Sequence, residues 1–288
     1  MKCVVLGNGL IGNAAAKMLE ANGHQVIAYD QNKSRSECSP MELLDKHVPE
    51  ADYVFSVVPT DPGKKGLKIA ALEDTAKIFE HYAKDTAVFV QRCTTLPGQA
   101  RQLAKRLGIE DRYVVFPSFA YRNSAVENEI NPPKVVLGGK NLAMLEQMVQ
   151  DLFSQLEDRT YYGTFEDAEA SKVYSNLWQG VILAVWNDLK YAAPDVDVNF
   201  VMETLIQEKN LSCLKRFIGK AWGKGGRLDD DMLGWVRNKQ ELSPIIVAAY
   251  EKNSQVRHDV GEENRPTSEL KKLAFEGRVS PTLVGCKK

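Results

Sequence analysis

A glycine-rich turn between an apolar strand and a helix constrains this chain more than any other feature of its 288 residues. An apolar run over residues 3–6 leads into Gly7-Asn-Gly9-Leu-Ile-Gly12, and an apolar-patterned helix follows over 14–20. A second apolar strand over 24–29 ends in Asp30. This order of elements is that of the dinucleotide-binding βαβ unit. The sequence therefore predicts a dinucleotide site; the alternative is a glycine-rich turn without a ligand.

Each part of the unit has a physical role toward a dinucleotide. The first glycine allows the tight turn, the second lets the backbone approach the pyrophosphate, and the third lets helix and strand pack closely. The helix N-terminus offers free N–H groups to phosphate. Asp30, 18 residues beyond Gly12, favours NAD because its carboxylate repels a 2′-phosphate, while Lys33 and Arg35 leave NADP open. The predicted cofactor contacts here are Gly7, Gly9, Leu10, Ile11, Gly12 and Asp30.

Composition and charge exclude several functional classes. With 44% hydrophobic and 26% charged residues the chain has the balance of a soluble globular protein, and its net charge of −1 predicts no nucleic-acid partner. No uncharged apolar run reaches the ~20 residues of a membrane span, so no membrane partner is expected. Five scattered cysteines are typical of a reducing cytoplasm, and the N-terminus leaves no room for a signal peptide. Histidine and cysteine spacings predict no metal site.

The pattern of the chain changes near residue 164. Strands and helices alternate before it, which predicts an α/β domain with a Rossmann-type doubly wound parallel sheet that ends at Gly138-Gly139. Beyond it, an all-helical domain built on a long central helix over 166–191 is expected. We therefore predict a dinucleotide-binding domain over 1–164 and a helical substrate and dimerisation domain over 165–288. Further strands are predicted at 51–58, 87–90, 113–116 and 134–137, and further helices at 41–46, 69–83, 99–107, 142–156, 199–207 and 245–256.

Several segments resemble, in order, motifs of the UDP-glucose/GDP-mannose dehydrogenase family. Ser56-Val-Val-Pro-Thr-Asp-Pro62 is similar to its Val-Pro-Thr-Pro strand end, and Arg92-Cys-Thr-Thr-Leu-Pro-Gly98 to its Ser-Thr-Val-x-Pro-Gly turn. Residues 116–125 and 131–138 follow its Pro-Glu-Phe-Leu and Asn-Pro-x-Arg-Ile-Val-x-Gly blocks. Glu169-Ala-Ser-Lys-Val-Tyr-Ser-Asn176 resembles its central-helix signature Glu-x-x-Lys-x-x-x-Asn. The shared order makes the resemblance specific over about residues 1–256.

The resemblance implies roles for individual residues. Val58, Pro59, Thr60 and Thr94 are expected at the cofactor, and Thr94 falls on the family's active-site threonine. Lys172 and Asn176 share one helix face, where the family's lysine and asparagine hold a proton or water near the reacting carbon. The alternatives are a solvated lysine on an amphipathic helix and an ordinary turn threonine. The predicted substrate contacts are Ser118, Phe119, Lys172, Asn176, Gly225 and Gly226.

The chain departs from the family at the residues that catalyse the formation of uronic acids. Members that oxidise an alcohol twice use a cysteine in a Gly-Phe-Gly-Gly-x-Cys loop, and the matching stretch, residues 222–231, has no cysteine. Asp229, Asp230 and Asp231 occupy that stretch, either as substrate contacts or as a solvated charge run. Ser118 stands at the position of the family's glutamate that serves thioester hydrolysis. No counterpart of the family's third, nucleotide-holding domain is found. Nucleophile and hydrolytic carboxylate are thus lost together.

The sequence therefore predicts an NAD-dependent oxidoreductase that makes a single two-electron hydride transfer on an alcohol or carbonyl of a sugar-like or nucleoside-like substrate. Lys172 would be the general base, with Asn176 and Thr94 positioning the hydroxyl. The alternatives are a β-hydroxyacid dehydrogenase and a non-catalytic dinucleotide-binding protein. A homodimer is expected, because the family's central helix is a subunit contact. The apolar positions expected to need a partner surface are Leu177, Val181, Leu183, Val185 and Trp186.

Overall fold

The structure is a computed structural model, which describes residues 1–63, 66–192, 195–197, 200–201, 234 and 247–253. The chain forms two compact units, one of residues 1–60 with 69–173 and one of residues 61–68 with 174–288. The first unit contains the glycine-rich turn and most of the predicted site residues.

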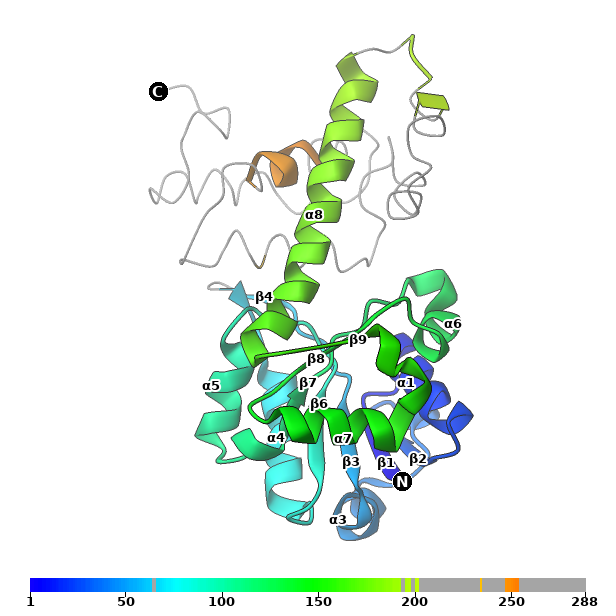
Figure 1. Ribbon diagram of the computed structural model, residues 1–288, viewed down its shortest axis with the longest axis vertical. Coiled ribbons are helices and arrows are strands. Elements are labelled where there is room, and N and C mark those ends of the chain that lie inside the picture. The colour runs from blue at the N-terminus through cyan, green and yellow to red at the C-terminus, as the bar shows by residue number, and fades with distance from the viewer. Residues whose placement is uncertain (64–65, 193–194, 198–199, 202–233, 235–246, 254–288) are drawn as a thin grey trace. The chain divides into compact units, whose positions relative to one another are not determined.

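A seven-stranded sheet lies at the centre of the first unit, in the order β2-β1-β3-β6-β7-β8-β9 (Figure 1). Neighbouring strands are parallel, except that β7 and β8 pair antiparallel at Val115 and Gly138. The predicted doubly wound sheet is confirmed, but two details were wrong: β8 reverses direction, and β9 continues the sheet beyond Gly139. The strands are β1 (Lys2–Leu6), β2 (Gln25–Tyr29), β3 (Tyr53–Ser56), β6 (Val88–Gln91), β7 (Tyr113–Val115), β8 (Val135–Gly138) and β9 (Thr160–Gly163).

The reversal at β8 follows from the short connection before it. Between β7 and β8 the only α-helix is α6 (Ala125–Ile130), six residues long. A parallel connection needs a crossover of a dozen or more residues, usually a longer helix that spans one face of the sheet. Here the chain re-enters the sheet from the edge at which it left, so residues 116–134 stay at the carboxyl ends of the parallel strands.

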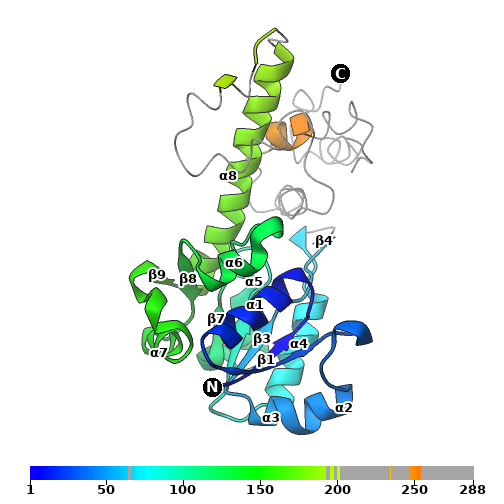
Figure 2. The same ribbon diagram turned by 90° about the vertical axis from the view of Figure 1, so that its right-hand side faces the viewer.

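Helices cover both faces of the sheet. Cys3 and Val5 pack with α1 and α7 on one face, and Val4 and Leu6 pack with α4 and α5 on the other. Figure 2 shows α7 and α4 on opposite sides of the strands. Because successive strand residues point to opposite faces, a strand covered on both sides is apolar throughout. The helices are α1 (Leu10–Ala21), α4 (Ala70–Tyr82), α5 (Gln99–Arg106) and α7 (Leu142–Phe153).

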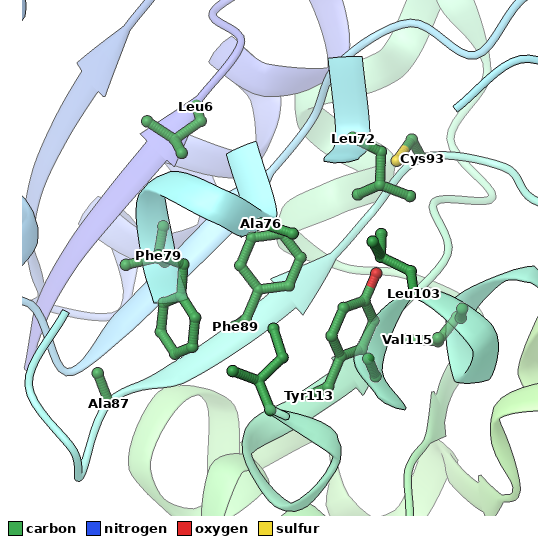
Figure 3. Packing of buried hydrophobic residues seen from close by; sticks show 14 of the residues in the cluster. Leu6, Leu72, Ala76, Phe79, Ala87, Phe89, Cys93, Leu103, Tyr113 and Val115 are labelled. Carbon is green, nitrogen blue, oxygen red and sulfur yellow. The ribbon is translucent and has the colours of Figure 1, made fainter. Parts of the chain in front are cut away.

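An aromatic core holds the face that α4 and α5 cover (Figure 3). The ring of Phe89 lies 5.4 Å from that of Phe79 and 5.0 Å from that of Tyr113, and all three side chains are fully buried. The Tyr113 hydroxyl donates a hydrogen bond to Gln91 Oε1 at 2.6 Å, so its polar end is satisfied. This core fixes the carboxyl ends of β6 and β7, from which several candidate site residues follow.

The strand order also fixes where a ligand is expected. β1 lies between β2 and β3; the helix after β1 covers one face, and the helix α4 that follows β3 covers the other. In open α/β sheets, ligands bind outside the carboxyl ends of the strands at such a reversal. The glycine-rich turn follows β1 directly, so it lies at this position.

Several short elements refine the predicted ranges. The predicted helix 41–46 is divided into α2 (Pro40–Glu42), a π-helical turn η2 (Leu43–His47) and α3 (Val48–Glu50). Ser39 and Glu42 form a capping box at its start. The predicted helix 142–156 begins as α7, which ends at Phe153, and the chain continues as the 3₁₀ turn η5 (Ser154–Arg159). Elements not predicted are α6, the 3₁₀ turns η1 (Lys33–Arg35), η3 (Glu110–Arg112) and η4 (Arg122–Ser124), and the strands β4 (Pro62–Gly63) and β5 (Gly66–Leu67).

The predicted central helix is α8 (Phe165–Ala192). In the second unit, Asn187 Nδ2 donates to Asn253 Oδ1 at 2.9 Å, and Asn253 Nδ2 donates to the Gly180 carbonyl, which joins α8 to the helical residues 247–253. The β4–β5 hairpin also belongs to this unit. Most of the predicted helix 199–207 lies outside the described residues. Within the described ranges, no helix has both the length and the apolar character to cross a membrane.

Candidate functional site

The glycine-rich turn is built from contacts that leave no room for side chains. Gly7 has φ +98°, and a Cβ there would lie 2.4 Å from the Val57 carbonyl oxygen. A Cβ on Gly12 would lie 1.7 Å from the Gly7 carbonyl oxygen. The first and third glycines therefore hold β1, α1 and the end of β3 together, which agrees with the roles predicted for them.

Gly9 differs, because no atom lies within 4 Å of where its Cβ would be. Gly9 is also the N-cap of α1, and no side chain caps that helix end. The N–H groups of the first turn, which includes Leu10, Ile11 and Gly12, therefore face an open position at the positive end of the helix dipole. A dinucleotide pyrophosphate fits these donors and this space.

Asp30 is tied to the glycine-rich turn. One carboxylate oxygen accepts a hydrogen bond from the Asn8 N–H at 2.9 Å, and the other accepts one from the Asn32 N–H at 2.8 Å. Each carboxylate oxygen has a second lone pair, so the pair of ribose hydroxyls still has acceptors. The structure thus brings the predicted acid beside the predicted phosphate site.

An open groove of about 490 Å³ runs beside this turn. It contains Arg35, one of the two cations that left NADP open, and Asn8, whose Oδ1 is buried with no hydrogen-bond partner. An unpaired buried acceptor next to Asp30 suits a ligand with hydroxyl or amino donors, as an adenosine has. The groove is lined by Asn8, Gly9, Leu10, Asn13, Ser34, Arg35, Ser36 and Glu37.

The ends of β3 and β6 meet through two predicted cofactor residues. The Thr60 hydroxyl donates to the Thr94 carbonyl at 2.7 Å, and both residues are buried. Val58 is half-buried and Pro59 is exposed, so the segment before Thr60 reaches the surface. The structure therefore brings Val58, Pro59, Thr60 and Thr94 together at one edge of the sheet.

A buried carboxylate, Glu169, fixes the loop that contains Thr94. Glu169 lies on α8 and accepts hydrogen bonds from the Thr95 hydroxyl at 2.7 Å, the Gly98 N–H at 2.7 Å and the Ala100 N–H at 2.8 Å. It therefore occupies the N-terminal end of α5, which has no other side-chain cap. Burial raises the pKa of Glu169 to about 7, against these three donors, which lower it.

Ser118 takes part in a buried ionic cluster that the sequence did not predict. Its hydroxyl donates to Glu129 Oε1 of α6, and Glu129 Oε2 accepts from Arg92 Nη2 at 2.6 Å. The Arg92 guanidinium stacks on the Phe116 ring, with Cζ 4.0 Å from the ring centroid. Arg92 and Glu129 are both almost fully buried, so a carboxylate stands within hydrogen-bond reach of position 118 although residue 118 is a serine.

Phe119 lies next to two lysines. Lys172 Nζ is 5.5 Å from its ring centroid, and Lys134 Nζ is 4.2 Å from it. Burial lowers the pKa of Lys134. Lys172 is half-buried and Asn176, one turn further along α8, is buried, which argues against the alternative of a fully solvated lysine.

Some predicted residues lie outside the described ranges, namely Gly225, Gly226 and Asp229 to Asp231. Conversely, the sequence did not single out Glu129, Lys134 or the Gln91–Tyr113 pair. No local pattern could have found them, because a charged residue in a short helix or before a strand is normally solvated. Among the described residues, no three histidine, cysteine or acidic side chains are grouped so that they could hold a metal ion.

Comparison with known proteins agrees with the nucleotide half of the site. Residues 1–77 match the family described as D-isomer specific 2-hydroxyacid dehydrogenase, NAD binding domain. This match covers the glycine-rich turn, Asp30 and the end of β3, and it supports NAD as the cofactor of this part of the chain.

Curated relatives match a longer stretch. GDP-mannose 6-dehydrogenase of Pseudomonas syringae pv. syringae is 24% identical in an alignment of 267 positions, and the match covers 78% of this chain and 61% of that protein. UDP-glucose 6-dehydrogenase 3 of Oryza sativa subsp. japonica is 24% identical in an alignment of 249 positions, and the match covers 78% of this chain and 52% of that protein. The predicted resemblance to the UDP-glucose/GDP-mannose dehydrogenases is confirmed. The chain spans only 52 to 61% of the length of these two relatives.

Solved structures show the same fold. A UDP-glucose dehydrogenase from Pyrobaculum islandicum superposes with a TM-score of 0.75 at 20% identity, over 95% of this chain and 71% of that one. A ternary complex of GDP-mannose dehydrogenase from Pseudomonas aeruginosa gives a TM-score of 0.63 at 20% identity, over 96% and 68%.

Two glycine substitutions should separate ligand contact from folding. Gly9→Ala adds a methyl group into open space, so thermal stability should be unchanged while NADH binding weakens by about ten-fold or more, because the pyrophosphate loses its close approach. Gly12→Ala forces a clash with the Gly7 carbonyl and should lower the melting temperature by several degrees. Fluorescence titration with NADH and thermal melts measure both effects. Unchanged NADH affinity in Gly9→Ala would contradict the pyrophosphate position.

Glu169 predicts a pH dependence of stability. Because the folded state holds its proton more tightly than the unfolded chain, the free energy of unfolding should fall as pH rises from 4.5 to about 7, and then level off. Relative to Glu169→Gln, the loss should reach about 3 kcal/mol. Urea unfolding at a series of pH values measures it. Glu166→Gln is the control: Arg101 lowers the pKa of Glu166, so this carboxylate contributes stability that is lost as the pH falls, which is the opposite trend. If the free energy of unfolding of wild type and of Glu169→Gln changed in parallel with pH, the assignment would be contradicted.

Proposed function

We propose that the protein is an NAD-dependent dehydrogenase that makes one two-electron oxidation of a CH–OH group, or the reverse reduction. The observation that supports it most is the contact of Lys172 with Phe119. Phe119 belongs to the segment after β7, at the carboxyl edge of the sheet where the glycine-rich turn and Thr94 also lie. A lysine for acid/base work and a dinucleotide site thus occur in one compact unit.

Bound NAD supplies the hydride acceptor. In the proposed reaction Lys172, in its neutral form, takes the proton of the substrate hydroxyl as the C–H hydride leaves, and the products are a carbonyl compound, NADH and a lysine ammonium. Asn176 and Thr94 orient the hydroxyl. In the reverse direction, the Lys172 ammonium returns the proton to the new alkoxide.

The chain's own residues support a reaction that stops at the carbonyl. A thioester route needs an accessible thiolate. Burial raises the pKa of Cys3 to about 12 and also raises that of Cys38, and Cys93 is buried. Cys3 and Cys38 are thiols outside any disulfide, which also supports a reducing cytoplasm. Residues 222–231 contain no cysteine.

The names of the relatives, which specify GDP-mannose and UDP-glucose, support the proposed substrate class. A sugar-like or nucleoside-like alcohol is therefore the first choice. The NAD-binding match to the 2-hydroxyacid dehydrogenases favours a small hydroxy acid as the second. A dinucleotide-binding protein without catalysis is the third reading, against which the Lys172 environment counts.

Stoichiometry tests the proposed function. We expect one NADH per substrate consumed when the full chain is incubated with NAD and a panel of UDP-sugars, sugar phosphates, nucleosides and hydroxy acids. Absorbance at the NADH band and substrate loss by chromatography give the ratio. Two NADH per UDP-sugar would overturn the single oxidation, and NADH binding without turnover on any substrate would favour the non-catalytic reading.

Lys172→Ala should abolish turnover while leaving cofactor binding intact. Loss of a general base lowers the rate by about 10² to 10⁴-fold, and the dissociation constant of NADH should change by less than about two-fold. Lys140→Ala is the matched control, because Lys140 is exposed and pairs with Asp111. Steady-state rates and NADH titration measure the pair, and a near-normal rate in Lys172→Ala would remove Lys172 from the mechanism.

We also propose a homodimer formed through α8. Among the five positions predicted to need a partner, Leu177 and Leu183 are buried within the chain and Val185 is exposed. Two aromatic residues of α8 not in that set, Tyr174 and Trp178, are also exposed, Trp178 at 64%. Tyr174 and Trp178 are four residues apart and Val185 seven further, so all three lie on one helix face.

The dimer is tested by mass in solution. Wild type should elute as a dimer in light-scattering chromatography, and Trp178→Glu should shift it toward the monomer, because a charge on the proposed contact face costs desolvation without a partner. Tyr161→Glu is the control, since Tyr161 is equally exposed but lies on β9. A monomeric wild type at micromolar concentration would contradict the proposal.

A further inference from the structure

Positive charge gathers around the segment from Phe116 to Phe119. Arg92 stacks on the Phe116 ring, and Lys134 and Lys172 both face the Phe119 ring. A single carboxylate, Glu129, reaches this segment through hydrogen bonds, and it is already paired with Arg92. The described contacts around this segment therefore contain three cations and one anion.

Arg92 provides the first sign that an anion belongs here. Its Nη2 donates to Glu129, but its Nε and Nη1 are buried without any hydrogen-bond partner in the described structure. An arginine has five N–H donors and remains charged, so three of them are left without an acceptor. Unpaired buried donors of this kind are rare in native proteins and mark a site for a water, an ion or a ligand. The pairing with Glu129 and the stacking on Phe116 hold the guanidinium in place, and those donors stay without an acceptor.

Lys134 provides an independent sign. It is half-buried and packs against Phe119, and it makes no hydrogen bond or ion pair with any described residue. Partial burial of a lysine ammonium that has no anionic partner costs free energy, and an anionic ligand would offset that cost. Lys172 faces the same ring, so two lysine side chains lie around Phe119.

We propose that Arg92 and Lys134, with Ser118 and Phe119, form a subsite for an oxyanion on the substrate, a carboxylate or a phosphate. An oxyanion can accept a charge-assisted hydrogen bond from an unpaired N–H of Arg92, and the Lys134 ammonium adds a point charge. Ser118, Phe119 and Lys134 are half-buried and reach the surface, whereas Arg92 is buried and is connected to Ser118 through Glu129. The subsite deepens the proposed function: it makes the substrate an acidic sugar derivative rather than a neutral polyol, with the anion bound beside Lys172.

Direct binding of anions tests the subsite without requiring turnover. The full chain is saturated with NADH, so that the N-terminus of α1 is occupied, and titrated at constant ionic strength with inorganic phosphate, D-gluconate and neutral sorbitol by calorimetry. We expect saturable binding of at least one anion and none of sorbitol. Tighter phosphate than gluconate assigns the subsite to a phosphate, and the reverse order assigns it to a carboxylate.

Three variants locate the binding. Lys134→Gln and Arg92→Lys should each raise the anion dissociation constant by about ten-fold, the effect of one lost charge-assisted contact. Lys140→Gln, which removes an exposed, paired lysine elsewhere, should leave it unchanged. Arg92→Lys disturbs the buried pair with Glu129 and has to be checked by thermal melting. Lys134 contacts the Phe119 ring but makes no hydrogen bond or ion pair with a described residue, so Lys134→Gln should fold normally and keeps the test valid.

The outcomes are distinct from those of the proposed function. Anion binding that needs Lys134 and Arg92 supports the subsite even if no substrate is turned over. No saturable anion binding, or binding that neither Lys134→Gln nor Arg92→Lys weakens, overturns the subsite while leaving the dehydrogenase proposal intact. If NADH itself fails to bind, the proposed function fails, and the same titration of the free chain still decides the subsite through the Lys134→Gln variant.

Discussion

The carboxylate of Glu169 connects α8 to the loop after β6 and to the start of α5. It lies near the start of α8, accepts the hydroxyl of Thr95, and accepts backbone N–H groups at the start of α5. The Thr95 hydroxyl in turn accepts a hydrogen bond from Gln91 Nε2, and Gln91 Oε1 accepts one from the Tyr113 hydroxyl in the aromatic core. The loop that contains Thr94 is therefore fixed from the helix above it and from the sheet below it. Any reaction that depends on Thr94 depends on this network, since a loop held at one end only would not position a hydroxyl.

The glycine-rich turn depends on a different constraint, the close packing of backbone against backbone. Gly7 and Gly12 are needed because the turn packs against β3 and against itself, whereas Gly9 touches nothing and is needed only if something else approaches. The same turn holds Asp30 through the Asn8 N–H, so the acid and the helix N-terminus keep a fixed spacing. Folding and cofactor binding thus make different demands on three glycines that look alike in the sequence.

Position 118 shows how a substitution in one segment is accompanied by a residue from another. The family resemblance places a glutamate there, and the chain has a serine. The serine hydroxyl is bonded to Glu129 from α6, which in turn neutralises part of Arg92. The sequence predicted that the carboxylate is lost here, but a carboxylate from a different element, α6, lies within hydrogen-bond distance of residue 118. It is paired with the cation of Arg92 and accepts the hydrogen bond of the Ser118 hydroxyl.

Features that have a period or a spacing could be predicted from the residues alone. Alternation of apolar strands and helices predicted the doubly wound sheet, the Gly-x-Gly-x-x-Gly turn with Asp30 predicted the dinucleotide position, and the Lys-x-x-x-Asn spacing placed Lys172 and Asn176 on one face of a long helix. The antiparallel β8, the added strand β9 and the ionic cluster of Arg92, Glu129 and Ser118 are visible only in the folded chain. The reason is physical: local patterns record which side of a helix or strand is buried, whereas a buried charge pair depends on two segments 37 residues apart meeting in space.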